Sequence, residues 1–503
     1  MWAKCPAGQF SLVSTVYFSL LLDNILLTVV VPIVPDYLYG LEATESAADT
    51  ITSTTAPPPP PPPRGNNSNA GIVVVTTTAA ATVANVSSDL AVDENGRVGL
   101  LLSSKALVQL VLNPAVGSLT GRLGYARPLL LGNVGLLLVA LLFAFGRTYA
   151  VLFLARSVQG LSSACIGVSG MSLVASGYPE EDQRSCVMGY VLGSVALGVL
   201  LGYPMGSVLY DLGGKPAPFL LVAALVAALI VVQIYAVEFE AVEQKAESDA
   251  NWMRLLLDPR ILIIAGAIWI STTPMAILEP CLPIWLRSHI KPKKWQLGTV
   301  FIPDSLGYLL GTNFFGLWAF RHGRCRTAVL AMAVVGLSAL GIPRARSMAE
   351  LAVPHLGLGL GIGVADAALV PLLAALVDRR PTASYGPVYS LQQAAVCLAY
   401  SLGPIASGEL VKSIGFEWVM RLAGLACLAY CPLLVYLARE RRRSADEVTI
   451  PMTDRRGINA ANRQTYSSVE KAPATSGSSQ ARGPTTAKYQ RFRDDGTDDD
   501  AAL

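Results

Sequence analysis

Six ionisable side chains lie inside long apolar blocks of the sequence, where charge is costly. They are four acids and two bases: Asp23, Glu279, Asp304, Asp366, Lys105 and Arg156. An ionisable group at the centre of a lipid bilayer costs about 2.5–3.5 kcal/mol, so each is a candidate functional residue. The excess of acids in an apolar interior favours a cationic ligand or protons and argues against an anionic ligand.

The sequence around three of the acids suggests how each is used. Asp23 lies between LLL and NILL, too deep in its block to cap a helix; a hydrogen bond to a neighbouring helix is the structural alternative. Glu279 precedes Pro280, and proline removes a backbone hydrogen bond, which can leave carbonyl groups open to a ligand. Asp366 lies in the run GLGLGIGVADAALVP, where glycines allow helices to approach closely. A buried aspartate in that setting suits a proton carrier.

The other charged residues leave more than one interpretation open. Asp304 and Tyr308 are four residues apart and share a helix face, although Asp304 lies nearer a helix end, where it could equally mark the mouth of a pathway. Lys105 and Arg156 are expected to neutralise acids on other helices, in either a structural or a transport role. Three aromatic residues could stack on a cation, with core packing as the alternative for each: Trp285, Tyr389 and Tyr400.

Composition shows which elements position these residues. Of the 503 residues, 52% are hydrophobic and only 15% are charged, against about 25% charged in a soluble domain. The apolar blocks are about 20 residues long, which is enough to cross a bilayer. A soluble enzyme is excluded, and the sequence has no phosphate-binding loop or nucleophile–base signature. The net charge of +3 is too small to indicate a nucleic-acid partner.

Twelve apolar blocks predict an all-α membrane protein with twelve transmembrane helices in two six-helix halves. The predicted spans are 10–37, 98–120, 127–145, 149–176, 185–212, 216–237, 261–286, 296–320, 327–343, 351–377, 388–414 and 416–437. We expect a short cytosolic N-terminus (1–9), an N-terminal half (10–237), a cytosolic linker (238–260), a C-terminal half (261–437) and a disordered cytosolic tail (438–503). Transporters commonly bind their substrate between two such halves.

Basic residues in the short loops set the orientation. They fall on one side, which the positive-inside rule makes cytosolic: Arg122, Arg127, Arg321, Arg324, Arg326, Arg379, Arg380, Arg439 and Arg441–Arg443. Three lysines on the opposite side are the exception: Lys291, Lys293 and Lys294.

The segments outside the bilayer carry further signals. The long loop 41–97 is predicted to face a lumen, and it contains both glycosylation sequons, at Asn66 and Asn85. The tail either binds trafficking adaptors or is simply a solvated segment. Eight cysteines without a CxxC pair or metal-ligand spacing indicate neither a disulfide framework nor a metal site.

Several runs resemble known transporter motifs. GSLTGRLGY, RSVQG and LGSVALGVLLGYPMG are similar to motifs of the major facilitator superfamily. More narrowly, the membrane portion resembles the vesicular amine transporters, and LEPCLPIW and GYLLGTN are closer to the monoamine branch than to the acetylcholine branch. The other runs that carry this resemblance are DNILLTVVVPIVPDYLY, SSKALVQLVLNP, KWQLG and YGPVYS.

The resemblance implies proton-coupled loading of cationic amines into acidic vesicles, with the proton gradient in place of a cofactor. By the family pattern, Asp23 and Asn24 would meet the ammonium group and Glu279 would help to bind it. Asp366 would carry protons. Three aromatic residues would line or gate the site: Trp285, Tyr308 and Tyr400.

The chain departs from the family pattern in several places. The eleventh span reads VYSLQQ, so Gln393 stands where the family has an aspartate, and Lys105 lacks the partner expected from the family. Pro381 replaces a histidine of the loop between spans ten and eleven, and the lumenal cysteines of the monoamine branch are missing. Asp304 replaces a small residue. One hypothesis is that Asp304 compensates for the acid lost at Gln393.

The sequence therefore predicts a proton-coupled antiporter, not an enzyme. It would load cationic monoamines from the cytosol into acidic secretory or synaptic vesicles by alternating access. Two alternatives stay open. The cargo could be another organic cation, such as acetylcholine, a polyamine or a drug. The chain could also be a family member that no longer transports because it has lost proton coupling.

Overall fold

The computed structural model describes residues 11–30, 33, 101, 103–236, 258–290, 299–378 and 384–448. Helices dominate this part of the chain, and it contains no β-strand. Several sequence predictions lie outside the described residues: the sequons at Asn66 and Asn85, the linker up to residue 257, Pro381, the three lumenal lysines and the tail beyond Val448.

The described residues form twelve long helices, which confirms the predicted fold class. The first half contains Ser11–Val30, 103–123, α3 (Ala126–Phe145), α4 (Tyr149–Gly177), α5 (Glu181–Gly213) and α6 (Pro216–Ala236). The second half contains α8 (Pro259–His289), α10 (Ile302–His322), α11 (Arg324–Gly341), α12 (Met348–Val377), α13 (Tyr385–Ile414) and α14 (Phe416–Val448), with a short 3₁₀ turn η2 (Ile342–Arg344) before α12.

Nine of the described helices are long and apolar enough to cross a membrane on length and composition alone. The other three are helix 103–123, α10 and α13. They are interrupted by polar residues, among them Lys105, Asp304 and Gln393. Polar side chains therefore lower the mean hydropathy of these three helices below that of a typical membrane span.

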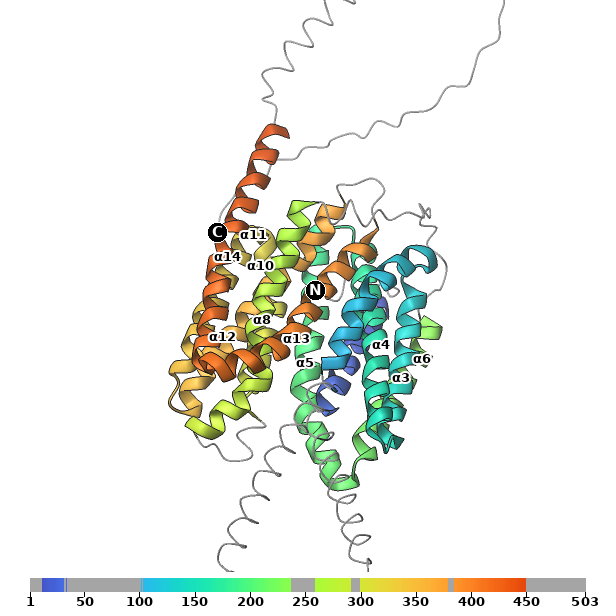
Figure 1. Ribbon diagram of the computed structural model, residues 1–503. Coiled ribbons are helices and arrows are strands. Elements are labelled where there is room, and N and C mark those ends of the chain that lie inside the picture. Colours follow the sequence, from blue (N-terminus) through green and yellow to red (C-terminus); the bar gives the residue numbers. More distant parts are fainter. Residues whose placement is uncertain are drawn as a thin grey trace, which may run out of the picture. The chain divides into compact units, whose positions relative to one another are not determined.

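The two halves lie side by side. In Figure 1, α3, α4 and α6 lie on one side, and α8, α10, α11, α12 and α14 lie on the other. Within the first half α3 packs against α4 and α6, and within the second α12 packs against α10 and α11. The halves meet where α5 contacts α10 and α12, and where α13 contacts α4. At the α5–α10 crossing, a side chain on Gly189 would collide with the carbonyl oxygen of Thr312, so only glycine allows this approach.

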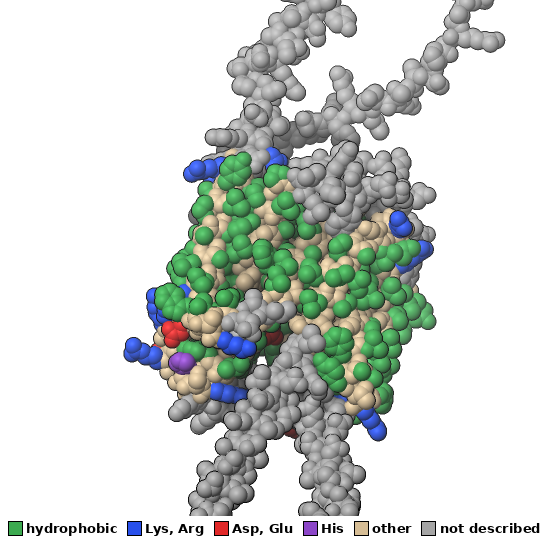
Figure 2. All heavy atoms as spheres, viewed as in Figure 1, with side chains coloured by type: hydrophobic (Ala, Val, Ile, Leu, Met, Phe, Trp, Pro, Cys, Tyr) green, Lys and Arg blue, Asp and Glu red, His purple; other side chains and the backbone are tan. Residues whose placement is uncertain are grey.

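The outer surface fits a lipid environment. Hydrophobic side chains cover most of the face in Figure 2, and the Lys and Arg side chains lie toward its two ends. Large exposed residues of this kind include Leu131, Phe145, Val231 and Phe314. An apolar belt with charged ends is what a polytopic membrane protein requires.

One predicted boundary needs correction. The tail was expected to be disordered from residue 438, but α14 continues to Val448. The added residues are rich in Arg, Glu and Ala, which have high helix propensity, so the last span extends past Leu437.

Candidate functional site

The acid of the first half is held by two partners. Asp23 is 5% exposed; its Oδ2 lies 3.6 Å from the Lys105 Nζ, and its Oδ1 accepts a hydrogen bond of 2.7 Å from the Ser163 hydroxyl. The ion pair joins helix Ser11–Val30 to helix 103–123, and the serine comes from α4. Lys105 thus has the acid from another helix that its burial requires. The partner is Asp23, whereas the family pattern would have placed it on the eleventh span.

The second base is more deeply buried and has no ion pair. Arg156 on α4 is 1% exposed. Its guanidinium donates to Gln159 Oε1 at 2.7 Å and to the Leu27 carbonyl at 3.5 Å. Among the described residues no carboxylate lies within 4.0 Å of it, but the charges of Asp23 and Glu279 act on it. Arg156 therefore links the acid of the first half electrostatically to the first acid of the second half.

Glu279 lies where the two halves face each other. The Tyr203 hydroxyl on α5 donates to Glu279 Oε1 on α8 at 3.3 Å, and both residues are half-buried. The Tyr203 ring also stacks on Phe301, with centroids 6.3 Å apart. The proline after Glu279 does not end the helix, because α8 is continuous from Pro259 to His289. Packing on neighbouring helices retains the segment although Pro280 cannot donate a backbone hydrogen bond.

Asp366 has a hydroxyl partner from the neighbouring helix. The Tyr308 hydroxyl on α10 donates to Asp366 Oδ2 on α12 at 2.8 Å. Asp366 is 6% exposed, and its Oδ1 is buried without a hydrogen-bond partner in the described part of the chain. One carboxylate oxygen is thus fixed and the other is free to take a proton.

Asp304 and Tyr400 complete the central group. Asp304, in the first turn of α10, is 7% exposed, and its buried Oδ1 likewise has no hydrogen-bond partner among the described residues. The charges of Glu279, Asp304 and Asp366 all act on the Tyr400 phenol of α13. The three acids of the second half therefore all interact electrostatically with one aromatic side chain.

Two residues expected to meet the ligand, Asn24 and Trp285, contact other parts of the protein in this structure. The Asn24 amide donates to the Leu20 carbonyl of its own helix at 2.8 Å, and its Cβ lies against Gly198 of α5. Trp285 is 6% exposed and packs between His289 and Phe416, with ring centroids at 4.9 and 5.2 Å. The structure thus gives Trp285 a place in the core of the second half.

Gln393, which stands on α13 where the family has an aspartate, lies near Lys105, the residue with which that aspartate would pair. Gln393 packs against Gly167 of α4. One turn later, Cys397 accepts a weak hydrogen bond of 3.7 Å from Asn113 on helix 103–123, and its thiol interacts electrostatically with Lys105. An acid at position 393 would therefore be placed near the Lys105–Asp23 pair.

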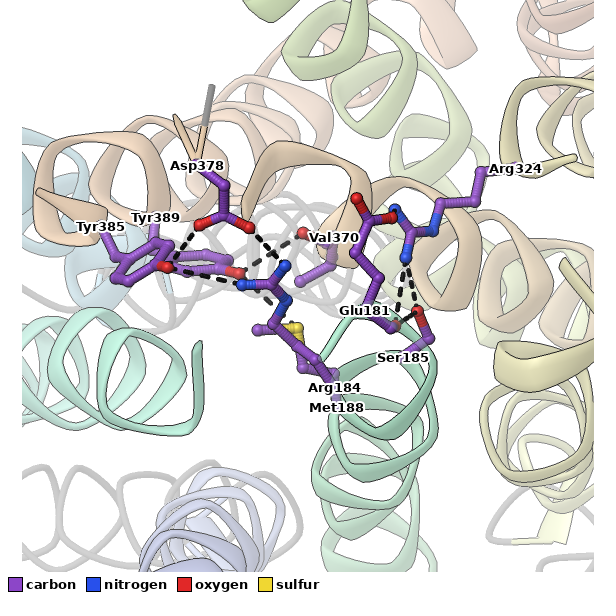
Figure 3. Close-up of polar contacts among 9 residues, drawn as sticks. All are labelled: Glu181, Arg184, Ser185, Met188, Arg324, Val370, Asp378, Tyr385 and Tyr389. Carbon is purple, nitrogen blue, oxygen red and sulfur yellow. Dashed lines mark hydrogen bonds and ion pairs between the residues drawn. The ribbon is translucent and has the colours of Figure 1, made fainter. Parts of the chain in front are cut away.

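A network that the sequence did not predict lies at the end of the helices that the loop charges predict to be cytosolic (Figure 3). Arg184 on α5 is fully buried; its Nη2 lies 2.5 Å from Asp378 Oδ2, just after α12, and its Nη1 lies 3.4 Å from the Tyr385 hydroxyl of α13. Tyr385 donates to Asp378 Oδ1 at 2.5 Å, and its backbone N–H donates to the Tyr125 hydroxyl. These contacts join the two halves.

A second ion pair lies beside the first. Arg324, at the start of α11, is 2.9 Å from Glu181 Oε2 and donates to the Ser185 hydroxyl at 2.7 Å. We call residues Glu181, Arg184, Ser185, Arg324, Asp378 and Tyr385 the cytosolic network, after the orientation that the loop charges predict. The sequence marked Arg324 only as a loop charge, and the others resemble ordinary residues at helix ends, so no sequence signal distinguished them.

Twelve helices in two halves, with buried charges between them and an ion-pair network at one end, define a secondary transporter. The family model described as Major Facilitator Superfamily matches residues 68–303 and 264–469. A solved structure, the human organic anion transporter MFSD10 (TETRAN), is similar in fold, with a TM-score of 0.65, 17% identity, and coverage of 86% of this chain and 100% of that chain.

Curated relatives define the family further. The chain is 40% identical to the synaptic vesicular amine transporter of Homo sapiens, over 84% of this chain and 87% of that protein. It is 37% identical to the vesicular acetylcholine transporter of Rattus norvegicus, over 83% of this chain and 81% of that protein. The chain therefore belongs to the vesicular amine transporter family of the major facilitator superfamily.

Proposed function

We propose that this protein is a proton-coupled antiporter that loads a cationic monoamine from the cytosol into acidic secretory or synaptic vesicles. It would be a multi-pass protein of the vesicle membrane and would work by alternating access. The gradient of protons, rather than a cofactor, would drive the cycle. Adaptors that read its C-terminal tail would direct it to its membrane.

The observation that carries the proposal is the uneven distribution of charge between the halves. Asp23 is neutralised by Lys105. Among the described residues, Glu279, Asp304 and Asp366 have no Lys or Arg within 4.0 Å. Buried carboxylates without counterions need a cation or a proton to be stable in an apolar surround. An amine and protons that bind these acids alternately would keep the carboxylates neutralised throughout the cycle.

The contacts suggest a sequence of events. An ammonium group arriving from the cytosol would meet Glu279, whose one hydrogen bond among the described residues comes from the Tyr203 hydroxyl at 3.3 Å. The halves would then close at the cytosolic network, which joins α5 to α11, α13 and the end of α12. Protons from the acidic lumen would neutralise the acids and release the amine. Each proton crossing one pH unit supplies about 1.4 kcal/mol, a factor of ten in accumulation.

The proposed cargo follows the names of the relatives and the chemistry of the site. The relatives include amine transporters of synaptic vesicles and of chromaffin granules. A primary ammonium can donate several hydrogen bonds to carboxylates, and Tyr400 offers a ring beside them. Acetylcholine has no such donor, although a relative that carries its name is nearly as similar to this chain.

Uptake of labelled amines into vesicles containing the protein tests the proposal. The panel would contain monoamines, acetylcholine and a polyamine, each with and without a proton uncoupler. We expect monoamine uptake that the uncoupler abolishes. Preferred uptake of acetylcholine or the polyamine would replace the proposed cargo. Uptake that the uncoupler leaves unchanged would contradict proton coupling, and no uptake of any amine would indicate a family member that no longer transports.

A further inference from the structure

A buried histidine on α12 has one ring nitrogen occupied and the other free. His355 has no exposed surface, and its Nδ1 lies 3.0 Å from the carbonyl oxygen of Val300, just before α10. A carbonyl can only accept, so Nδ1 carries the hydrogen and Nε2 of the neutral ring holds a lone pair. Nε2 is buried with no hydrogen-bond partner in the described part of the chain. An unsatisfied buried polar atom costs about 1–3 kcal/mol, which calls for an explanation.

One turn further along the packing of α10 on α12 lies Asp304. Asp304, in the first turn of α10, follows Val300 by four residues, and Gly359 follows His355 by four residues on α12. A side chain on Gly359 would collide with the carbonyl oxygen of Asp304 and come within 2.9 Å of its Oδ1, so only glycine permits this approach. The imidazole and the carboxylate therefore occupy successive turns of one helix–helix contact, about 5.4 Å apart along the helices.

The following turn of α10 carries Tyr308, which contacts Asp366 of α12. Tyr308 lies one turn beyond Asp304, and its backbone packs against Gly363 of α12. Its hydroxyl donates to Asp366 Oδ2 at 2.8 Å. We call the series His355, Asp304, Tyr308 and Asp366 the α10–α12 seam. It begins two turns into α12, toward the end opposite the cytosolic network, and ends at Asp366.

We propose that His355 and Asp304 are proton-relay residues that deliver lumenal protons along the α10–α12 seam to Asp366. Nε2 of His355 takes a proton from water that enters from the lumen. It passes that proton through a bridging water to the Asp304 carboxylate, because no contact within 4.0 Å joins the imidazole to that carboxylate. Asp304 passes it to the Tyr308 hydroxyl oxygen, while Tyr308 gives its own hydrogen to Asp366. Each step moves one proton and leaves the histidine, the aspartate and the tyrosine as they were.

The surroundings of the two relay residues are consistent with this role. The ring of Phe301 faces His355 with centroids 5.9 Å apart, and within the described part of the chain the imidazole has a polar contact only with the Val300 carbonyl. Glu279 of α8, Tyr400 of α13 and Tyr308 of α10 interact electrostatically with Asp304, and His355 of α12 lies one turn away along the seam. No basic residue among those described lies within 4.0 Å of Asp304, so the carboxylate has a proton as its natural partner.

The relay rests on the proposed antiport, so the experiment separates the two. Amine uptake driven by an acidic lumen would be compared with exchange of labelled for unlabelled amine at equal pH, which needs no net proton movement. His355→Asn retains an amide N–H that can donate to the Val300 carbonyl but cannot carry a proton. We expect gradient-driven uptake to fall about tenfold or more, with exchange retained. Asp304→Asn should do the same, and the double variant should be no slower than the slower single variant, because the two residues act in series.

His289→Asn is the matched control, since His289 is exposed at the end of α8 and lies off the seam. It should leave both reactions unchanged. The relay is overturned if His355→Asn takes up amine at the wild-type rate, or if uptake and exchange fall together, which would indicate a structural role. An absence of gradient-driven uptake in the wild-type protein would instead remove the proposed antiport itself.

Discussion

The two halves of the molecule treat their buried charges differently. In the first half Asp23 has a counterion in Lys105 and a hydrogen bond from Ser163, and the Arg156 guanidinium donates to Gln159. In the described part of the second half, Glu279 and Asp366 each have a hydrogen bond only from a tyrosine hydroxyl, at 3.3 and 2.8 Å. A paired charge stays fixed because separating it is costly, whereas an acid held by a neutral hydroxyl can exchange partners. The comparison assigns positioning to the first half and exchange of cargo and protons to the second.

Neutralising the acid between the halves should have the largest effect. Glu279→Gln retains the shape of the side chain and its contact with Tyr203 but removes the charge that the ammonium would meet. Losing one partner of a buried charge pair costs about 2–5 kcal/mol, so we expect amine uptake to fall about thirtyfold or more. Glu417→Gln is the control, because Glu417 lies in a half-exposed pair with Arg421. Equal uptake by the two variants would contradict the role given to the second half.

Breaking the Asp23–Lys105 ion pair should mainly lower the free energy of unfolding rather than change transport. Asp23→Asn leaves Lys105 buried without a counterion, and Lys105→Met leaves Asp23 in the same position. Each should destabilise the protein by about 3 kcal/mol, and the double variant should recover most of this loss. Thermal unfolding in detergent measures the cycle. If the double variant is as unstable as the sum of the singles, the pair is not the stabilising unit.

The cytosolic network should set the equilibrium between conformations that are closed and open at the cytosolic end. Arg184→Gln removes the contacts to Asp378 and Tyr385, so the cytosolic end should open more often, by about tenfold if the network contributes about 1.4 kcal/mol. Cys186 is half-buried on α5 beside Ser185. Its labelling from the cytosolic side by an impermeant maleimide, read by mass spectrometry, reports the opening.

Arg421→Gln, at the opposite end of the molecule, should leave the labelling rate of Cys186 unchanged. An unchanged rate in Arg184→Gln as well would show that the network does not hold the halves together.

The smallest effect should come from Asp304 on α10, which is proposed to compensate for the acid that α13 lacks at Gln393. If Asp304 compensates for Gln393 through its charge, Asp304→Asn should weaken amine binding about threefold, and Gln393→Asp in the same chain should restore it. Equilibrium binding of a labelled amine measures both variants. Wild-type transport and binding in Asp304→Asn, with no effect of Gln393→Asp, would end the compensation hypothesis. Gradient-driven uptake should stay low in the double variant, because position 393 is not on the α10–α12 seam.

The sequence predicted the fold closely because membrane spans depend on local composition. The twelve apolar blocks and the buried acids could be read directly, as could the shared face of Asp304 and Tyr308. Partners could not be predicted, because the Lys105–Asp23 contact joins residues far apart in the chain and depends on helix packing. His355 was missed because a single histidine in an apolar, glycine-rich run looks like any core residue. Only the structure shows that its Nε2 is buried with no hydrogen-bond partner among the described residues.

Lumenal pH, recorded while amine enters, tests the central claim most directly. Sealed vesicles with an acidic lumen and a trapped pH dye would receive amine from outside. If the acids of the second half exchange a cation for protons, the lumen should become less acidic in step with amine uptake, and Asp366→Asn should abolish this change. Amine accumulation against its gradient with no movement of protons would contradict the account.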